Sequence, residues 1–518
     1  MRKWTRAIGF LLDALIALII VVVVALHLMA PRLRAMVQDE ARYYLQTHFS
    51  SSVQFQSLDL DFYPHVHVVV NGLVMRHNGR TDIPPLFQMR RVTLNTTLLS
   101  LLRKRPKIKV VRVEGLQINT PPRMPGGPPM FHGTDANLAK KIPIVIGEIR
   151  VDNALITILR RDTKPPNQFQ IHDLVMNNFG FGRPAAFHAL LTNPKPHGDI
   201  HCDGLFGPWK ADDPSITPVS AKYTFFNADL GTLKGLHGIL SSVGTFAGPL
   251  DYLKVEGVTD TPDFALRTSA RPMALHTKFD AIVDGTNGNT VLTYVNATFL
   301  GTTIDTKGEV VDVYPKIKGR TIAFDAVSND ARVQDLLALA VKSDKPVMTG
   351  TARLKAKILI PERDEDVVDR MQINGQFGLG KIQFTNPTTQ GKVDTLSRKG
   401  RGRPSDMGII HSVSNLDGDF TMANGKIEFS QLRFGVEGAS VALVGTYDMD
   451  GGQMDFRGKL RMDAKLSQTM TGWKSVLLRP FNSFFEGPHK GTVIPIKITG
   501  TKDDPSFGPD FHDKENKE

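Results

Sequence analysis

The sequence predicts a mainly β protein with a single N-terminal transmembrane helix and a few amphipathic helices. Two observations predict this fold class. Residues 7–30 are almost entirely apolar, and about 20 apolar residues of helix are enough to span the hydrocarbon core of a bilayer. From residue 53 onward, apolar side chains recur at every second position in many short segments that end at turn residues, which is typical of antiparallel strands.

The apolar run at residues 7–30 is interpreted as an uncleaved membrane anchor, because the apolar region of a cleaved signal peptide spans only about 7–15 residues. Arg2, Lys3 and Arg6 precede the run, which favours a cytoplasmic N-terminus. The rest of the chain would then lie outside the cytoplasm. Asp13 is interpreted either as functional or as close enough to the helix end to reach the interface. The anchor residues are Ile8, Leu12, Leu15, Ile19, Val22 and Leu26.

The composition argues against several classes of protein. The chain has 518 residues, a formal net charge of +11 and one cysteine, Cys202, so an intramolecular disulfide framework is excluded. Lysine and arginine are spread along the sequence and mark no nucleic-acid site. The charge either draws a tethered protein to anionic lipid headgroups or serves solubility in general.

The first part of the chain after the anchor is predicted to hold one helix and a series of strands. Residues 31–49 repeat apolar side chains at three- and four-residue spacing, as an amphipathic helix does. Asn71-Gly72 follows an apolar run and is interpreted as a hairpin turn. Strands are predicted at residues 53–62, 65–70, 86–96 and 108–119, with a short helical turn at 97–103.

Residues 121–143 are dense in proline and glycine and are predicted to be a linker. In the β-rich region that follows, Asp284-Gly285 and Asn287-Gly288 are interpreted as turns. Alternation along residues 291–299 is expected to place one set of side chains on a common face of a strand. This set is Val291, Thr293, Val295, Ala297 and Phe299.

The sequence then predicts a helix at residues 328–341, with Asn329 or Asp330 as its N-cap. Residues 352–360 alternate apolar side chains with cations, which predicts a strand with one apolar and one solvated face. The cations are Arg353, Lys355 and Lys357.

Beyond this strand, residues 391–406 are predicted to be a flexible basic stretch, in which a solvated loop is a better interpretation than a headgroup or nucleic-acid site. Asn424-Gly425 and Asp450-Gly451 occupy hairpin positions between apolar runs. A helix is expected at residues 466–478 and a last strand at 492–499.

Three segments together resemble the two ends of bacterial AsmA-like proteins. They are LDLDFYPHVHVVVNGLVM at residues 58–75, PLFQMRRVTLNTTLLSLLRKRPKIKVVRVEGLQINTP at 85–121 and FNSFFEGPHKGTVIPIKITGTKDDPSFGPDF at 481–511. In that family, a single inner-membrane helix is followed by a chorein-like N-terminal module and a long periplasmic β structure. The middle of this chain is similar only in its strand-and-turn style.

The resemblance implies an order of regions along the chain. They are a cytoplasmic tip and transmembrane anchor (1–30), a chorein-like N-terminal module (31–120), the linker (121–143), a β-rich middle region (144–327), an AsmA-like C-terminal β region (328–510) and a polar tail (511–518).

One-sided strands must cover their apolar faces, and few helices are predicted to do so. From the pattern alone, either two sheets pack as a sandwich or one curved sheet leaves an apolar trough for acyl chains. The AsmA resemblance implies the second: an elongated, curved antiparallel β-sheet groove, as in the bridge-like lipid-transfer group. The groove candidates are Val291, Val295, Phe299, Leu354, Ile358, Phe420, Ile427, Phe429, Leu443 and Phe456. Headgroups are expected at a wet rim near Lys355 and Lys357.

Motifs for catalysis are lacking, because no G-x-S-x-G elbow, Walker A loop or H-E-x-x-H helix occurs in the sequence. No enzymatic activity and no cofactor are therefore predicted. His197, His201 and Cys202 are the tightest ligand-like group, but adjacent strand residues point to opposite faces, so no metal site is predicted. Asp59 and Asp61 are interpreted as polar positions of a strand rather than a glycosidase pair.

The expected function is phospholipid transfer or lipid homeostasis at the bacterial inner membrane, with the bulk of the chain in the periplasm. Phospholipids and the membrane are the expected partners, with a possible envelope protein and no nucleic acid. The alternative is a scaffold or assembly factor for outer-membrane and other envelope proteins, acting through exposed sheet edges.

Overall fold

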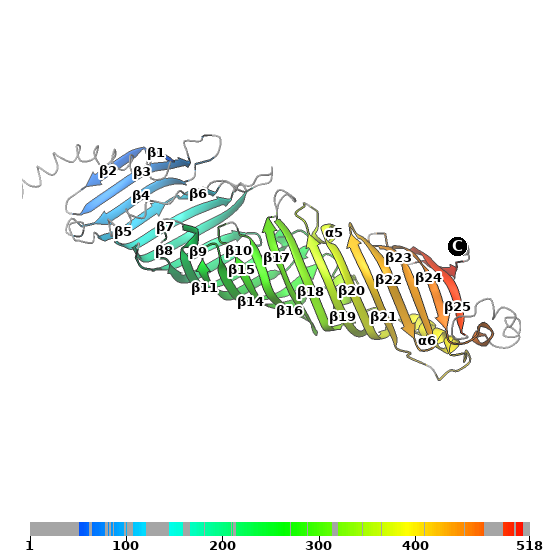
Figure 1. Ribbon diagram of the computed structural model, residues 1–518. Coiled ribbons are helices and arrows are strands. Elements are labelled where there is room, and N and C mark those ends of the chain that lie inside the picture. The colour runs from blue at the N-terminus through cyan, green and yellow to red at the C-terminus, as the bar shows by residue number, and fades with distance from the viewer. Residues whose placement is uncertain are drawn as a thin grey trace, which may run out of the picture. The chain divides into compact units, whose positions relative to one another are not determined.

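The computed structural model describes residues 51–510 except for a set of gaps. The gaps are 62–64, 78–80, 82–83, 86, 98–99, 101–106, 121–144, 159–165, 181, 209, 211–213, 270, 287, 313–319, 344, 364, 409, 450, 471–490 and 502–503. The described residues form many strands and few helices (Figure 1), so the prediction of a mainly β protein is confirmed.

Several predicted segments lie outside the described residues. These are the anchor with Ile8, Leu12, Leu15, Ile19, Val22 and Leu26, the helix at 31–49, the linker and the polar tail. Within the part of the chain that the structure describes, no helix is long and apolar enough to cross a membrane.

The chain divides into two compact units. The first comprises Met1–Ala228, Val243–Val255 and Val283–Asn287, and the second comprises Asp229–Ser242, Glu256–Ile282 and Gly288–Glu518.

The first unit is a sheet built mainly from antiparallel pairs. Strands β1 and β2 pair with β3, and β7 to β10 pair in sequence order. In contrast to the antiparallel prediction, β5 and β6 pair with β7 in parallel. The bounds are β1 (Ser51–Gln54), β2 (Ser57–Asp61), β3 (Val66–His77), β4 (Phe87–Thr96), β5 (Lys107–Glu114), β6 (Gln117–Thr120), β7 (Val145–Ile158), β8 (Asn167–Gly180), β9 (Ala185–Pro194), β10 (His197–Phe206), β11 (Pro218–Asp229) and the 3-10 turn η1 (Pro214–Ile216).

The predicted turn at Asn71-Gly72 is wrong, because both residues lie inside β3. The register between β3 and β4 continues on both sides of Gly72, whose φ is +62°. Tertiary pairing on both edges of β3 overrides the local turn preference of the Asn-Gly pair.

The second unit contains the longest run of antiparallel strands. Strands β16 to β26 each pair antiparallel with the next in sequence and lie side by side (Figure 1). The bounds are β12 (Leu236–His237), β13 (Ile239–Pro249), β14 (Leu253–Leu266), β15 (Met273–Val283), β16 (Thr290–Phe299), β17 (Thr302–Asp312), β18 (Arg320–Arg332), β19 (Met348–Ile360), β20 (Gln372–Phe384), β21 (Ser414–Ala423), β22 (Lys426–Val436), β23 (Ala439–Asp448), β24 (Gln453–Met462), β25 (Thr492–Thr501) and β26 (Pro505–Pro509). Strands β11, β13, β14 and β15 contribute residues to both units.

The helices and 3-10 turns of the second unit are η2 (Leu230–Thr232), α4 (Val333–Ala340), α5 (Val367–Arg370), α6 (Pro387–Gly400) and η3 (Leu466–Thr469). The predicted turn at Asp284-Gly285 is confirmed by the Asp284 side chain, whose Oδ1 accepts from the Thr286 N–H at 2.9 Å. The hairpin turn at Asn424-Gly425 is also confirmed, with φ values of 50° and 72°.

The predicted helix at residues 328–341 begins later than expected. Ser328 and Ala331 still pair with β19, and α4 starts at Val333 with Arg332 as its N-cap. The polar run Ser-Asn-Asp resembles a capping signal, but strand pairing holds it extended.

The predicted flexible stretch at residues 391–406 is wrong, because α6 occupies most of it. Asn386 caps this helix by accepting from the N–H groups of Thr388 and Thr389, and Pro387 occupies the first turn. An Asn cap followed by proline is a helix-start signal that the basic residues obscured. The strand predicted at residues 492–499 is confirmed as β25, but it is not the last strand, because β26 follows it.

Candidate functional site: an apolar sheet face

One face of the second unit's sheet is continuously apolar from β19 to β24, because the register aligns apolar residues across strands. We refer to it as the apolar face. Three neighbouring rows compose it. They are Leu354, Phe377, Gly418, Leu432 and Leu443; Ala356, Gly375, Phe420, Phe429, Gly445 and Phe456; and Ile358, Ile373, Met422 and Ile427.

The opposite face of the same strands is polar. In β19, Arg353, Lys355 and Lys357 are exposed, whereas Ala352 and Ala356 between them are buried, so the predicted alternation is confirmed. Lys355 and Lys357 therefore lie on the face opposite to Leu354 and do not rim the apolar face. Neighbouring positions of a strand project to opposite sides of its sheet. The prediction that Lys355 and Lys357 contact headgroups on the rim of the apolar face is therefore wrong.

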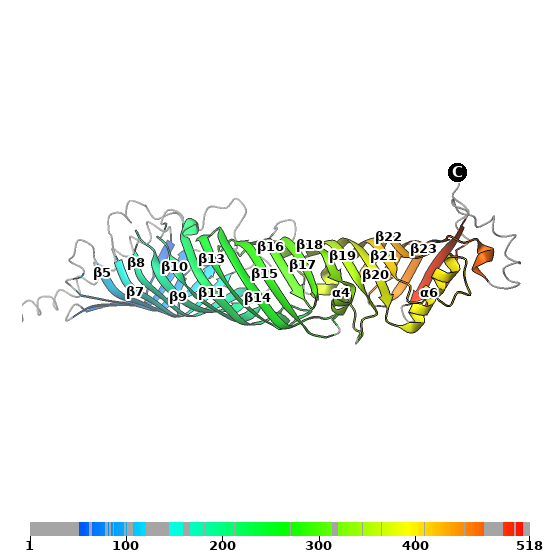
Figure 2. The same cartoon turned by 90° about the horizontal axis from the view of Figure 1, so that it is seen from below.

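Helices α4 and α6 cover one margin of the sheet (Figure 2). Val333, Leu336 and Leu337 of α4 pack with Ala331 and Ala352. Helix α6 packs Val393 and Leu396 against another cluster at this margin, which consists of Val436, Ala439 and Met462. Neither cluster includes Phe377, Phe420 or Phe429.

Four phenylalanines make a contiguous aromatic cluster on the apolar face. The ring centroids of Phe420 and Phe429 lie 6.2 Å apart, and Phe377 lies 6.0 Å from Phe420 and 6.4 Å from Phe429. Phe456 extends the cluster, 5.8 Å from Phe429. These separations lie in the range of favourable aromatic pairs.

Two of the phenylalanine rings cover glycines that face them across the strands. Gly375 pairs with Phe420 and Gly418 with Phe377. A Cβ on Gly375 would lie 2.8 Å from Cε1 of Phe420, and one on Gly418 would lie 3.0 Å from Cε1 of Phe377. A ring that covers a cross-strand glycine fills the place of the missing side chain. The result is an apolar surface made of rings and the glycine backbone that they cover.

Among the predicted groove residues, Val291 is on the wrong face. A bulge between Leu292 and Val295 shifts the register, so that Val291 pairs with Glu309 whereas Val295 pairs with Thr306. Glu309 and Thr306 are on opposite sides of β17, and Val291 is accordingly 40% exposed. A bulge reverses the alternation of a strand, and nothing in the local sequence predicted it.

The other predicted groove residues lie on the apolar side of the sheet. Phe299, Leu443 and Phe456 are buried, whereas Val295, Leu354, Ile358, Phe420, Ile427 and Phe429 are half-buried. Sequence reasoning missed Ile373 and Phe377 of β20. The alternation of Ile373, Phe377 and Leu379 was the signal that could have found them.

The residues of the first unit that were considered as metal ligands or as a catalytic pair lie within strands of the sheet. His201 makes an edge contact with Phe226, with ring centroids 4.9 Å apart, and Asp59 and Asp61 are exposed on β2. No group of three or more His, Cys, Asp or Glu side chains that could hold a metal ion is found in the described ranges. Burial raises the pKa of the Cys202 thiol to about 11, with a further contribution from Asp203.

We expect Cys202 to resist thiol reagents in the folded protein. With a pKa of about 11, about one thiol in a thousand is ionised at pH 8, and the thiolate is the reactive form. Maleimide labelling followed by intact-mass measurement should show slow modification of the folded chain and rapid modification after unfolding in guanidinium. Equally rapid labelling of both states would contradict this assignment.

Comparison with known proteins adds no family assignment: no family model matches the chain, and the search of curated proteins found no match.

Proposed function

We propose that the apolar face holds the acyl chains of phospholipids, and that the protein is a membrane-anchored, AsmA-like lipid-transfer or lipid-homeostasis protein of the bacterial envelope. The observation that carries the proposal is the glycine–phenylalanine pairing. Phe420 and Phe377 reach over Gly375 and Gly418, so these glycine positions are covered by rings from the neighbouring strands and add no side chain of their own to the apolar face. An apolar sheet face must be covered, and the clusters under helices α4 and α6 do not include Phe377, Phe420 or Phe429.

Hydrophobic free energy is sufficient for such binding. Each methylene that leaves water contributes about 0.8 kcal/mol, so a chain that buries ten of them gains about 8 kcal/mol. Neighbouring rows of the apolar face have similar chemistry, which would let a chain move across the strands between states of similar free energy. No bond is made or broken, and no catalytic residue is required.

The alternative, a scaffold that pairs with envelope proteins through a sheet edge, has weaker support. Strand β26 pairs with β25, and its Phe507 is 68% exposed. However, the strand begins with Pro505 and ends with Pro509. Proline lacks the N–H group needed for further pairing and protects sheet edges.

The proposal predicts that Leu354→Glu combined with Phe429→Glu removes co-purifying phospholipid. Both side chains are half-buried on the apolar face. A carboxylate placed against hydrocarbon costs more than the 1.4 kcal/mol that changes binding ten-fold. We therefore expect at least about ten-fold less lipid by mass spectrometry of extracts from the detergent-purified full chain.

The matched control is Val291→Glu combined with Val444→Glu, since these residues are 40% and 53% exposed on the polar face. This variant should keep its lipid. Equal lipid yields from the two double variants, both folded by circular dichroism, would refute the proposal. A stable crosslinked protein partner without bound lipid would favour the scaffold instead.

A further inference from the structure

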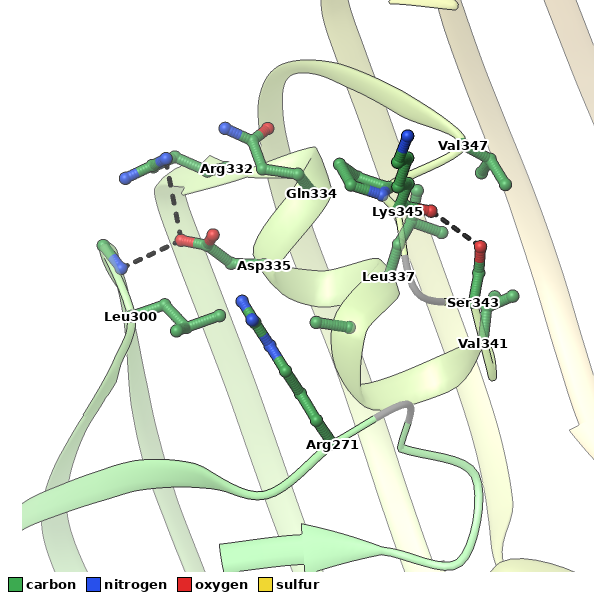
Figure 3. Close-up of a pocket in the computed structure, with 13 residues that line it drawn as sticks. Arg271, Leu300, Arg332, Gln334, Asp335, Leu337, Val341, Ser343, Lys345 and Val347 are labelled. Carbon is green, nitrogen blue, oxygen red and sulfur yellow. Dashed lines mark hydrogen bonds and ion pairs between the residues drawn. The ribbon is translucent and has the colours of Figure 1, made fainter. Parts of the chain in front are cut away.

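A pocket of about 360 Å³ lies beside α4 in the second unit (Figure 3). It is enclosed by Arg271, by the turn at Leu300 and Gly301, by α4, and by the connection from α4 to β19. Leu337 of α4 lines this pocket and also packs with Ala352 at the covered margin of the sheet. The pocket therefore adjoins the margin of the apolar face.

Among the described residues that line the pocket, Asp335 is the one carboxylate, and it is already satisfied by the protein. Asp335 is 3% exposed, and its Oδ2 accepts from the Gly301 N–H at 3.0 Å and from the Thr302 hydroxyl at 2.9 Å. Arg332 Nε lies 3.7 Å from the same oxygen. These bonds tie the β16–β17 turn to α4 and leave this carboxylate oxygen little capacity to neutralise another cation.

Three cations line the pocket: Arg271, Arg332 and Lys345. Arg332 shares Asp335, but neither Arg271 nor Lys345 forms an ion pair with any carboxylate among the residues that the structure describes. Arg271 reaches toward α4 beside Leu300 (Figure 3). An excess of cations in a concave site favours an anionic ligand, and guanidinium groups match the geometry of phosphate.

The same pocket exposes large apolar side chains. Leu300, Val341 and Val347 line it and are 48%, 38% and 41% exposed. Leu300 also has a φ of +52°, a left-handed conformation that is unfavourable for a bulky side chain. A residue such as asparagine would adopt this conformation more easily. The leucine strains the turn, which indicates that its side chain serves an apolar contact.

We propose that this pocket binds the phosphate-bearing headgroup of an anionic amphiphile. The phosphate lies at Arg271, and the first part of the attached chain lies against Leu300, Val341 and Val347. A pocket of this volume is at the small end of ligand sites, so it holds a headgroup and a short length of chain. The choice of a lipid as the source of the phosphate rests on the proposed function.

The test is photo-crosslinking of the full-length, detergent-purified chain with a lysophosphatidate that carries a photoreactive group near its headgroup. Peptide mapping should place the crosslink on α4 or the connection to β19. Unlabelled lysophosphatidate should compete for the site, whereas inorganic phosphate and a lysophosphatidylcholine of the same chain length should compete at least about ten-fold more weakly. Equal competition by inorganic phosphate would show that the pocket binds free anions rather than a lipid headgroup. Equal competition by lysophosphatidylcholine would show that the net charge of the headgroup does not matter. Either result overturns the proposal.

Two variants test the two halves of the pocket. Arg271→Gln should reduce crosslinking about ten-fold, the loss typical of one charged hydrogen-bond partner, and Arg353→Gln on the polar face should leave it unchanged. Leu300→Asn should reduce crosslinking several-fold while the melting temperature stays the same or rises. Unchanged crosslinking in Arg271→Gln, or equal losses in Arg271→Gln and Arg353→Gln, would refute the site.

The outcome is separable from that of the proposed function. If the variant with Leu354→Glu and Phe429→Glu keeps its lipid, the apolar face is not the chain-holding surface, and the Arg271→Gln comparison still decides whether the pocket binds the headgroup. If that double variant loses its lipid and Arg271→Gln changes nothing, the pocket proposal alone fails.

Discussion

Replacing Gly445 by alanine is expected to destabilise the second unit by about 3 kcal/mol or more, among the larger effects of a single substitution. A Cβ at this position would lie 2.1 Å from the backbone oxygen of Asp455 and 2.7 Å from Cα of Phe456. Both atoms belong to the backbone of the paired strand β24, so no side-chain rotation relieves the clash. The φ of +158° also favours glycine.

The measurement is thermal unfolding of the full chain by circular dichroism, with an expected decrease of about 5–10 °C in the transition of this unit. Gly435→Ala is the matched control, because a Cβ on Gly435 in the neighbouring strand β22 has no atom within 4 Å. That control should change the transition little. Equal effects of the two substitutions would show that strands β23 and β24 are not paired in this register.

Asp394→Ala is expected to destabilise the same unit by about 2–4 kcal/mol at neutral pH. The buried carboxylate on α6 accepts from the Ser412 N–H at 2.8 Å, the Gln390 amide at 3.0 Å and the His411 N–H at 3.2 Å. Alanine leaves these donors without their acceptor, and a buried unsatisfied donor costs about 1–3 kcal/mol. Denaturant unfolding of both proteins measures the difference.

The loss should depend on pH in a defined direction. Burial alone would raise the pKa of the Asp394 carboxyl, but the hydrogen bonds from Ser412, Gln390 and His411 hold that pKa below its ordinary value. A folded-state pKa lower than the unfolded one stabilises the protein above the unfolded value of about 3.9, and this stabilisation is lost as pH falls through the folded value. The difference between wild type and Asp394→Ala should therefore shrink below about pH 4.

Asp394→Asn is the control for charge, because asparagine keeps an acceptor oxygen but has no ionised form. It should be less destabilising than alanine at pH 7 and should show a stability that does not change through the titration of this site. A wild-type advantage over alanine that stays constant between pH 7 and pH 3 would contradict the assigned role of the carboxylate.

Local alternation carried most of what the sequence predicted about the apolar face. Apolar residues occupy every second position from Ala352 to Ile358 in β19, and the structure places Leu354 and Ile358 on one face with the two alanines. Phe420, Phe429 and Phe456 were selected for the same reason and lie in one aromatic cluster. Strand periodicity is a property of neighbouring residues, so it can be interpreted without knowledge of the fold.

The misses in the sheet have one physical cause, which is that pairing partners are distant in sequence. Val291 changed face because of a bulge against β17, and Ser328 and Ala331 stayed extended because β19 pairs with them. The parallel pairing of β5 with β7 likewise depends on residues far apart in the chain. Helix α6 was missed for a different reason. Its cap at Asn386 is a local signal, but the basic residues that follow led to the prediction of a solvated loop.

By itself, the sequence determined that the strands are one-sided and which residue types line each side, because side chains alternate along any extended backbone. The tertiary structure alone decided that Gly375 faces Phe420 and that Gly418 faces Phe377. It also brought Arg271 and Lys345 into one pocket with Asp335. Register and loop placement arise from the summed contacts of whole strands and helices, and these contacts join residues that no local pattern connects.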